Sequence, residues 1–244
     1  MTTLEVAAQA KGASKIYGSG QTEVHALRDV DVGFQKSKFT AIMGPSGSGK
    51  STLMHCMAGL DRLTSGEAFI GDTAISTLND KELTELRRNR VGFIFQAYNL
   101  VPTLNAKENI TLPMDLGGRD YDKAWVDEVI ATVGLSDRVT HRPNELSGGQ
   151  QQRVAVARAL ASKPEIVYGD EPTGNLDSTT SAEILDFMRA AVDELGQTIV
   201  MVTHDPRGAS YADQVLFLDD GEIVHELFDP TPDRIYDTIR ELGE

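Results

Sequence analysis

The stretch "GPSGSGKST", residues 44–52, constrains the fold of this chain more than any other feature. It fits the pattern G-x-x-x-x-G-K-[ST], in which the backbone N–H groups of a glycine-rich loop surround the phosphates of a nucleotide. The apolar run "FTAIM" precedes it and the helical pattern "STLMHCMAGL" follows it, which is the strand–loop–helix context that the motif requires. The sequence therefore predicts a P-loop fold that binds a nucleoside triphosphate.

Each part of this phosphate loop has an expected role. The glycines let the backbone turn inward, and the N-terminus of the following helix adds partial positive charge. Lys50 is expected to reach the β- and γ-phosphates, and the Ser51 hydroxyl to bind Mg²⁺. The loop residues expected to contact the nucleotide are Gly44, Pro45, Ser46, Gly47, Ser48, Gly49, Lys50, Ser51 and Thr52.

Apolar runs of strand length recur along the chain, separated by stretches long enough for crossover helices. Strands that are apolar throughout are typical of a parallel sheet covered on both faces. Val126, Val129, Ile130 and Val133 instead follow helical spacing. We predict one α/β domain, 1–244, with a core of about 1–96 and 164–244 and a helical insertion of about 97–163. The expected strands lie at 38–43, 91–95, 165–169, 198–203 and 214–219.

Two acidic residues end the apolar run "EIVYGDEP" about 120 residues after the phosphate loop. In P-loop proteins an acid at this strand end holds Mg²⁺, usually through water, which is the role expected of Asp170. The adjacent Glu171 is expected to accept a proton from the attacking water, as general base.

The helical stretch "NELSGGQQQRVAVARAL", residues 144–160, opens with two glycines that each weaken a helix by about 1 kcal/mol relative to alanine. Ser147 is well placed as its N-cap. Glycines in the first turn would let an anion approach the unpaired N–H groups closely. We interpret this terminus as a second phosphate site. The alternative is that Gly148 and Gly149 only end the preceding loop.

Together these motifs resemble those of the ATP-binding-cassette (ABC) superfamily. "LSGGQQQR", 146–153, is similar to its signature sequence, and other motifs occur in the family's order over nearly the whole chain. By this resemblance Tyr17 stacks on adenine and Gln96 contacts Mg²⁺ and senses the partner. Asp177 corresponds to the aspartate of the D-loop, and His204 to the switch histidine at the γ-phosphate.

The resemblance also implies a fold and an assembly. The fold is the P-loop ABC ATPase fold, a RecA-like core with an antiparallel β subdomain and a helical subdomain. Two copies pack head to tail around ATP. The implied sites are Glu171, His204 and Gln96 for catalysis, Ser51, Gln96 and Asp170 for Mg²⁺, and Ser147, Gly148, Gly149, Gln150 and Asp177 for the ATP of the partner copy.

Two further stretches, 99–114 and 170–177, resemble the lipoprotein-releasing and macrolide-exporter cassettes. These cassettes convert ATP-driven dimer closure into movement of a separate membrane permease. In this interpretation a permease helix docks in a groove near Gln96 lined by Tyr98, Leu100 and Val101. One alternative is a cassette that regulates an extracytoplasmic cell-wall hydrolase through its permease. A remote alternative is a soluble ABC ATPase that acts on nucleic acid.

Composition bears on location and partners. The net charge of −14 argues against a nucleic-acid surface, because such surfaces are built from clustered Lys and Arg. No apolar run approaches the roughly 20 residues that span a bilayer, and the N-terminus lacks a signal-peptide pattern. The single Cys56 is expected to be a buried thiol. We expect a cytoplasmic protein held peripherally at the inner face of the membrane by its permease.

Overall fold

The computed structural model describes residues 5–118 and 120–243, so both ends of the predicted domain span lie outside the described residues. Its main sheet has the order β10-β9-β3-β8-β7-β6, and all pairings are parallel except that of β10 with β9. This confirms the predicted α/β class and the mostly parallel sheet. The strands are β3 (Phe39–Met43), β6 (Val91–Phe95), β7 (Ile166–Asp170), β8 (Ile199–Val202), β9 (Gln214–Asp219) and β10 (Glu222–Phe228).

The strand β10 was not among the five expected strands. It forms a hairpin with β9 through Asp220 and Gly221, whose φ angles are 42° and 81°. Two consecutive positive φ angles are typical of the tight turn that joins antiparallel strands with the correct twist. Most of β10 is exposed or half-buried, so it lacks the continuous apolar run that marks the other strands.

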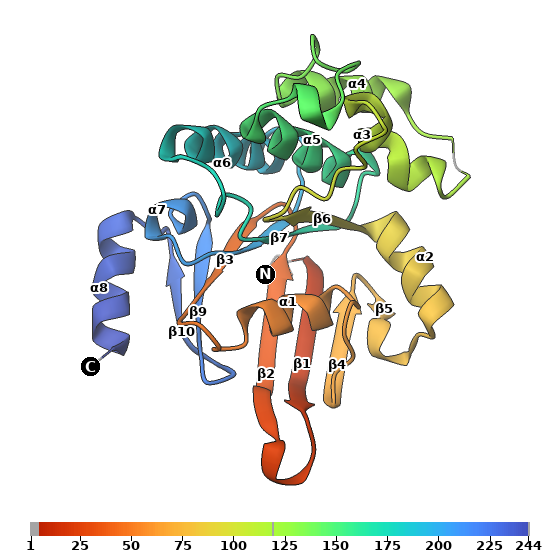
Figure 1. Cartoon of the computed structure of the whole chain (residues 1–244). Helices are drawn as coiled ribbons and strands as arrows, with labels where there is room; N and C mark the ends of the chain where they lie inside the picture. The colour runs from red at the N-terminus through yellow and green to blue at the C-terminus, as the bar shows by residue number, and fades with distance from the viewer. Residues whose placement is uncertain (1–4, 119, 244) are drawn as a thin grey trace.

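A second sheet of order β2-β1-β4-β5 is antiparallel, as the family resemblance implied. Figure 1 shows its two long strands, β1 and β2, extending away from the rest of the molecule as a hairpin. The strands are β1 (Val6–Tyr17), β2 (Val24–Gln35), β4 (Ser65–Ile70) and β5 (Thr73–Ala74), and short 3-10 turns are η1 (Gly20–Thr22), η2 (Ile75–Thr77) and η3 (Pro143–Glu145).

Helix α1 (Lys50–Met57) lies between the two sheets. Its buried side chains, Leu53, Met54, Cys56 and Met57, share one core cluster with residues from both sheets. Burial raises the pKa of the Cys56 thiol to about 12, as expected of a buried structural thiol. The first turn of this helix follows the phosphate loop directly, so packing of α1 between the sheets fixes where that loop stands.

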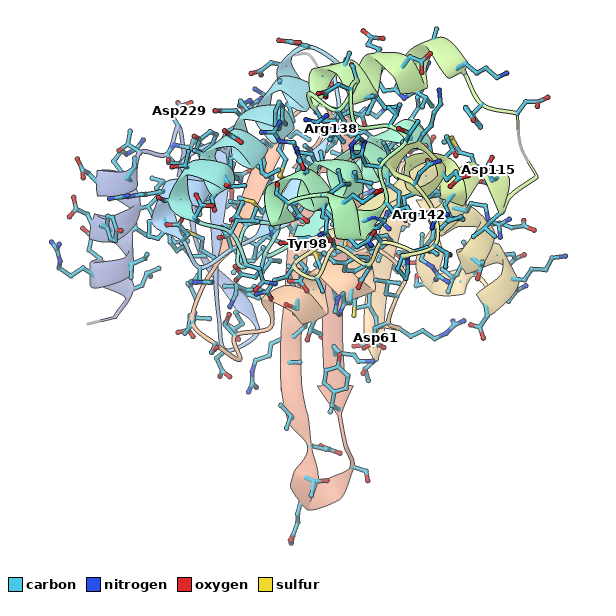
Figure 2. The ribbon with its side chains drawn as sticks, turned by 45° about the horizontal axis from the view of Figure 1, so that its top comes forward. Asp61, Tyr98, Asp115, Arg138, Arg142 and Asp229 are labelled. Carbon is cyan, nitrogen blue, oxygen red and sulfur yellow. The ribbon has the colours of Figure 1, made fainter. Side chains whose placement is uncertain are left out.

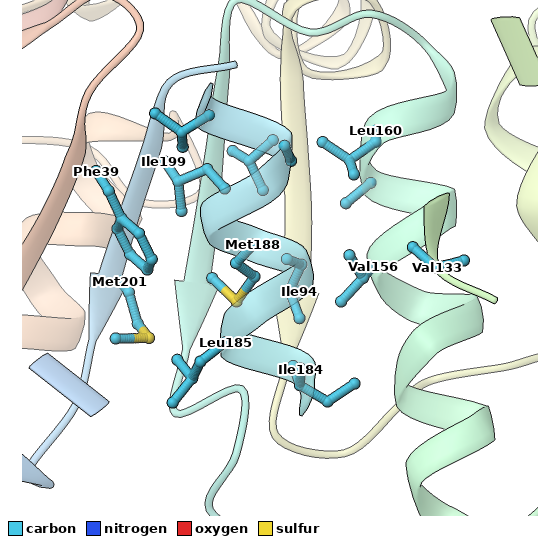
Figure 3. Packing of buried hydrophobic residues seen from close by; sticks show 14 of the residues in the cluster. Phe39, Ile94, Val133, Val156, Leu160, Ile184, Leu185, Met188, Ile199 and Met201 are labelled. Carbon is cyan, nitrogen blue, oxygen red and sulfur yellow. The ribbon is translucent and has the colours of Figure 1, made fainter. Parts of the chain in front are cut away.

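Helices α3 to α8 contribute buried side chains to a second core cluster, whereas Leu83 and Leu86 of α2 belong to the cluster of α1. Figure 3 shows Met188 of α6 between Met201 of β8 and Ile94 of β6, with Val156 of α5 beyond Ile94, in the second core cluster. Figure 1 shows α3, α4 and α5 gathered at the end of the molecule opposite the β1–β2 hairpin. The helices are α2 (Asp80–Arg90), α3 (Ala106–Asp115), α4 (Lys123–Thr132), α5 (Gly148–Ala161), α6 (Ser178–Asp193), α7 (Pro206–Ala209) and α8 (Pro232–Leu242).

Helices α3, α4 and α5 fall within the predicted insertion at 97–163. Three of the described α-helices begin with complete capping boxes, Asn79 with Glu82, Asn105 with Glu108 and Ser147 with Gln150. Among the described residues, no helix is both long enough and apolar enough to cross a membrane. The division into core and helical subdomain stays a prediction.

Candidate functional site

The phosphate loop joins β3 to α1 in a conformation that needs glycine. Gly44, Gly47 and Gly49 all have positive φ, at 149°, 83° and 103°. A Cβ on Gly44 would lie 1.9 Å from the Leu218 carbonyl oxygen, whereas one on Gly47 would meet open space. The N–H of Gly221, in the β9–β10 turn, donates to the Ser48 carbonyl at 3.0 Å. The loop is therefore held from outside and leaves its inner side open.

A pocket of about 300 Å³ lies on the inner side of this loop. Lys50 borders it, and its ammonium donates to the Gly44 and Pro45 carbonyls at 3.0 and 2.7 Å. Burial lowers the Lys50 pKa, while the carboxylates of Glu171 and Asp170 act in the opposite direction. A half-buried ammonium whose bonded partners are carbonyls suits an anionic ligand. The lining residues are Val24, Ala26, Ser46, Gly47, Gly49, Lys50, Ser51, Thr52, Glu171 and Val202.

A hydroxyl and a carboxylate meet where Mg²⁺ was predicted. The Ser51 hydroxyl donates to Asp170 Oδ1 at 3.2 Å, joining the start of α1 to the end of β7. His55 Nε2 lies 4.0 Å from the other carboxylate oxygen. Hard oxygen ligands held in this way fit Mg²⁺, which binds proteins through one or two carboxylates plus substrate phosphates. Of the three predicted ligands Ser51 lines the pocket, whereas Asp170 and Gln96 do not.

Glu171 has an unusual backbone conformation, with φ of 48°. A non-glycine residue in this left-handed region costs about 1 kcal/mol or more, and such strain concentrates at functional sites. Its N–H donates to the Val202 carbonyl at 3.0 Å, which holds the strained turn against β8. Its Oε1 lies 2.9 Å from His204 Nδ1. The structure thus brings two predicted catalytic residues into contact, and Glu171 also lines the pocket beside Lys50.

Gln96 and Tyr17 lie in polar networks that the sequence did not predict. The Gln96 amide donates to Asn175 Oδ1 at 3.3 Å, and the Asn175 amide donates to the Gln96 carbonyl at 3.0 Å. The Tyr17 hydroxyl donates to Asp61 at 2.6 Å. Burial and the hydrogen bond to Asp61 together raise the Tyr17 pKa to about 12. The adenine role of Tyr17 and the Mg²⁺ role of Gln96 stay predictions.

Helix α5 begins at Gly148, with Ser147 as its N-cap, so the alternative that the two glycines only end the preceding loop is wrong. The Ser147 hydroxyl accepts from the Gln150 N–H at 3.3 Å, and the Gln150 side chain accepts from the Ser147 N–H at 3.0 Å. The Asp177 carboxylate caps α6 by accepting from the Thr179 and Thr180 N–H groups, each at 3.0 Å. None of these residues lines the pocket beside Lys50.

The two glycines of α5 also have a steric role within the chain. A Cβ on Gly148 would lie 2.9 Å from the Tyr98 hydroxyl, and one on Gly149 would lie 2.4 Å from Cγ2 of Thr180. Figure 2 shows Tyr98 near α5. Close packing against α6 and the segment after β6 is therefore a reason for glycine here that sequence reasoning missed.

Another residue that sequence reasoning missed is Gln152, which is fully buried in α5. Its amide donates to the Pro172 carbonyl and, at 3.4 Å, to the Phe95 carbonyl. Phe95 immediately precedes Gln96, and Pro172 immediately follows Glu171. One side chain of the signature helix thus contacts the backbone next to two predicted catalytic residues. A glutamine on a buried helix face is the signal that could have revealed it.

This geometry defines a P-loop ATP-binding cassette, and comparison with known proteins agrees. The family model described as ABC transporter matches residues 27–174. An ABC transporter ATP-binding protein of Methanocaldococcus jannaschii is 45% identical over 218 residues, 88% of this chain and 97% of that protein. The chain therefore belongs to the ABC transporter family, as an ATP-binding cassette.

Two further relatives bear on assembly and function. Another M. jannaschii cassette has been solved as a dimer in a post-hydrolysis state bound to ADP and phosphate, and it matches with a TM-score of 0.81 at 39% identity, covering 92% of this chain and 99% of that one. The macrolide export ATP-binding/permease protein of Neisseria gonorrhoeae is 42% identical over 221 residues, 89% of this chain but 34% of that protein.

The packing role of Gly149 can be tested in the isolated chain. Gly149→Ala places a methyl group against Thr180 Cγ2, and we expect overpacking to lower the free energy of unfolding by about 1–3 kcal/mol. Adding Thr180→Ser removes Cγ2 but keeps the hydroxyl that donates to Asp177, so it should restore most of the loss. Urea unfolding without nucleotide measures both. A double variant as unstable as Gly149→Ala would contradict the packing role.

Proposed function

We propose that this protein is the ATP-hydrolysing subunit of an ABC transporter whose permease is a separate polypeptide. The contact between Glu171 and His204, at a pocket bordered by Lys50, is the observation that carries the proposal. Bound Mg²⁺ would neutralise phosphate charge during transfer to water. Ser51 and Asp170 would hold that ion, and Lys50 would bind the phosphates.

In the proposed reaction Glu171 accepts the proton of the attacking water. His204 holds the carboxylate through its 2.9 Å contact and reaches the γ-phosphate. The strained backbone at Glu171 directs its side chain into the pocket, which also contains Val202 at the end of β8. The products are ADP and phosphate, the pair bound in the dimeric relative.

The proposal includes a second copy of the chain. Ser147, Gly148, Gly149, Gln150 and Asp177 do not line their own pocket. They would contact the ATP of the partner copy, with the open N-terminus of α5 toward the γ-phosphate. Relatives solved as dimers support this arrangement. The same glycines then serve both packing within the chain and approach of an anion from outside.

A groove of about 460 Å³ supports the proposal of a membrane partner. Its exposed apolar side chains include Leu60 and Leu116, and three arginines, Arg87, Arg88 and Arg158, also line it. No carboxylate lines it among the described residues, in a chain of net charge −14. An amphipathic permease helix with acidic residues would complement this surface.

The groove differs from the one predicted from the sequence. Tyr98, Leu100 and Val101 do not line it, and Asn99 is the residue of that segment that does. The reason is local: Asn109 is buried and binds both backbone groups of Val101, while Arg158 binds the Tyr98 and Asn99 carbonyls. These bonds hold the segment against α3 and α5, and the groove opens toward α2 and β6 instead.

The proposed work is export or lipoprotein and peptide handling by movement of the permease, at the inner face of the membrane. The match to the macrolide export protein supports export. Regulation of a cell-wall hydrolase through the permease is the second candidate, because the same ATPase would serve it. Action on nucleic acid is disfavoured by the net charge of −14.

Glu171→Gln tests the general base. The amide cannot accept the proton, so we expect turnover to fall about 100-fold or more while ATP binding persists. The closed dimer should then accumulate with ATP and Mg²⁺ and elute early in size-exclusion chromatography. Glu194→Gln, the same change at an exposed position at the end of α6, is the control. Wild-type turnover in Glu171→Gln would exclude this assignment.

Ser147→Arg tests contact with the partner copy. It adds bulk and charge at the proposed γ-phosphate site, so ATPase activity with the cognate permease should be lost while ATP still binds. Ser136→Arg, the same change at an exposed position after α4, is the control and should retain activity. Unchanged activity in Ser147→Arg would mean that α5 does not cap the partner's ATP.

Affinity purification from detergent-solubilised membranes tests the partner. We expect a permease with a large extracytoplasmic domain, held by the arginine-lined groove. Arg88→Glu should reduce its recovery, whereas Arg138→Glu, outside the groove, should not. A permease bound to a cell-wall hydrolase would favour the second candidate over export, and recovery of nucleic acid without any permease would overturn both.

A further inference from the structure

The carboxylate of Asp61, in the loop after α1, holds Tyr17 at the end of β1. It accepts from the Tyr17 hydroxyl at 2.6 Å and from the Lys15 ammonium at 2.7 Å. It also accepts from the Arg62 N–H at 2.7 Å, and Lys15 donates a second bond to the Arg62 carbonyl at 2.8 Å. Figure 2 shows Asp61 at the base of the β1–β2 hairpin.

Lys15 also contacts the aromatic ring. Its Nζ lies 4.6 Å from the Tyr17 ring centroid, so it covers one face of the ring. Tyr17 is 41% exposed as a residue, which leaves part of it open to a planar group. The Lys15–Asp61 ion pair thus holds both the Tyr17 hydroxyl and one face of the Tyr17 ring.

Several features separate this cluster from an ordinary surface ion pair. The Lys15 side chain is 12% exposed, and three of the four hydrogen bonds are accepted by one carboxylate. Charge-assisted bonds of this kind are about twice as strong as neutral ones. Tyr17 pairs with Val24 across the β1–β2 hairpin, and Val24 lines the pocket of the phosphate loop together with Thr52, in the first turn of α1. The ring is therefore held beside the start of α1.

We propose that Asp61 and Lys15 are positioning residues that hold Tyr17 with its uncovered face toward the purine base of the nucleotide. This inference rests on the proposed ATP binding. A ring that is already fixed loses little rotamer freedom when the base stacks on it. The pair would contribute to affinity for the base and not to affinity for the phosphates, which bind at Lys50 and the loop.

A ligand without a base separates the two contributions. The full chain is titrated calorimetrically with ATP and with inorganic tripolyphosphate, each with Mg²⁺. In Asp61→Asn we expect ATP binding to weaken about fivefold, as loss of a charge-assisted hydrogen bond predicts. Tripolyphosphate binding should change less than about twofold, and turnover at saturating ATP should stay at the wild-type value. Asp80→Asn, in the exposed Arg62–Asp80 pair, is the control and should alter neither ligand.

A double-variant cycle tests whether Asp61 acts through Tyr17. Tyr17→Phe removes the hydroxyl but keeps the ring, so it should weaken ATP binding about as much as Asp61→Asn. The two changes together should cost no more than either alone, because they break the same bond. Additive losses would overturn the positioning role, as would equal losses for ATP and tripolyphosphate or unchanged ATP binding in Asp61→Asn. A wild-type chain that binds neither ligand would instead refute the proposed function.

Discussion

The parallel pairing of β3, β8, β7 and β6 is the constraint on which the site depends. Ile42 pairs with Val202, Val202 with Asp170, and Asp170 with Phe95, so the carboxyl ends of four strands stand at one level. Each strand is followed directly by a predicted functional segment: the phosphate loop, His204, Glu171 and Gln96. A shift in the register of one strand would separate Ser51 from Asp170 and Glu171 from His204. These contacts join strands that lie far apart in the sequence.

Helix α5 connects that sheet edge to the helical segment. Gln152 is bound to the Phe95 and Pro172 carbonyls, while the glycines at the start of the same helix contact Tyr98 and Thr180. A displacement of α5 would therefore shift the backbone beside Gln96 and Glu171. This gives a physical path between an event at the N-terminus of α5, where we place the partner's ATP, and the proposed general base.

Much of this could be predicted because the signals are local. The phosphate loop needs glycines with positive φ, a lysine and a hydroxyl in adjacent positions, and the apolar runs of the five expected strands all form strands of the main sheet. Ser147 caps α5 as its sequence context indicated. A docking groove lined by Tyr98, Leu100 and Val101 stays a prediction: of that segment only Asn99 lines the groove described above, and bonds from Asn109 and Arg158 hold the segment against α3 and α5.

The sequence by itself determined the α/β class, the nucleotide loop and the acids that follow β7, because periodicity and short motifs are properties of neighbouring residues. Tertiary structure alone decided which distant groups meet. It pairs Glu171 with His204, attaches Tyr17 to Asp61, and places Thr180 where a side chain on Gly149 would stand. These contacts join residues that lie 31 to 44 positions apart in the sequence. Their geometry follows from strand register and helix packing, which local sequence does not encode.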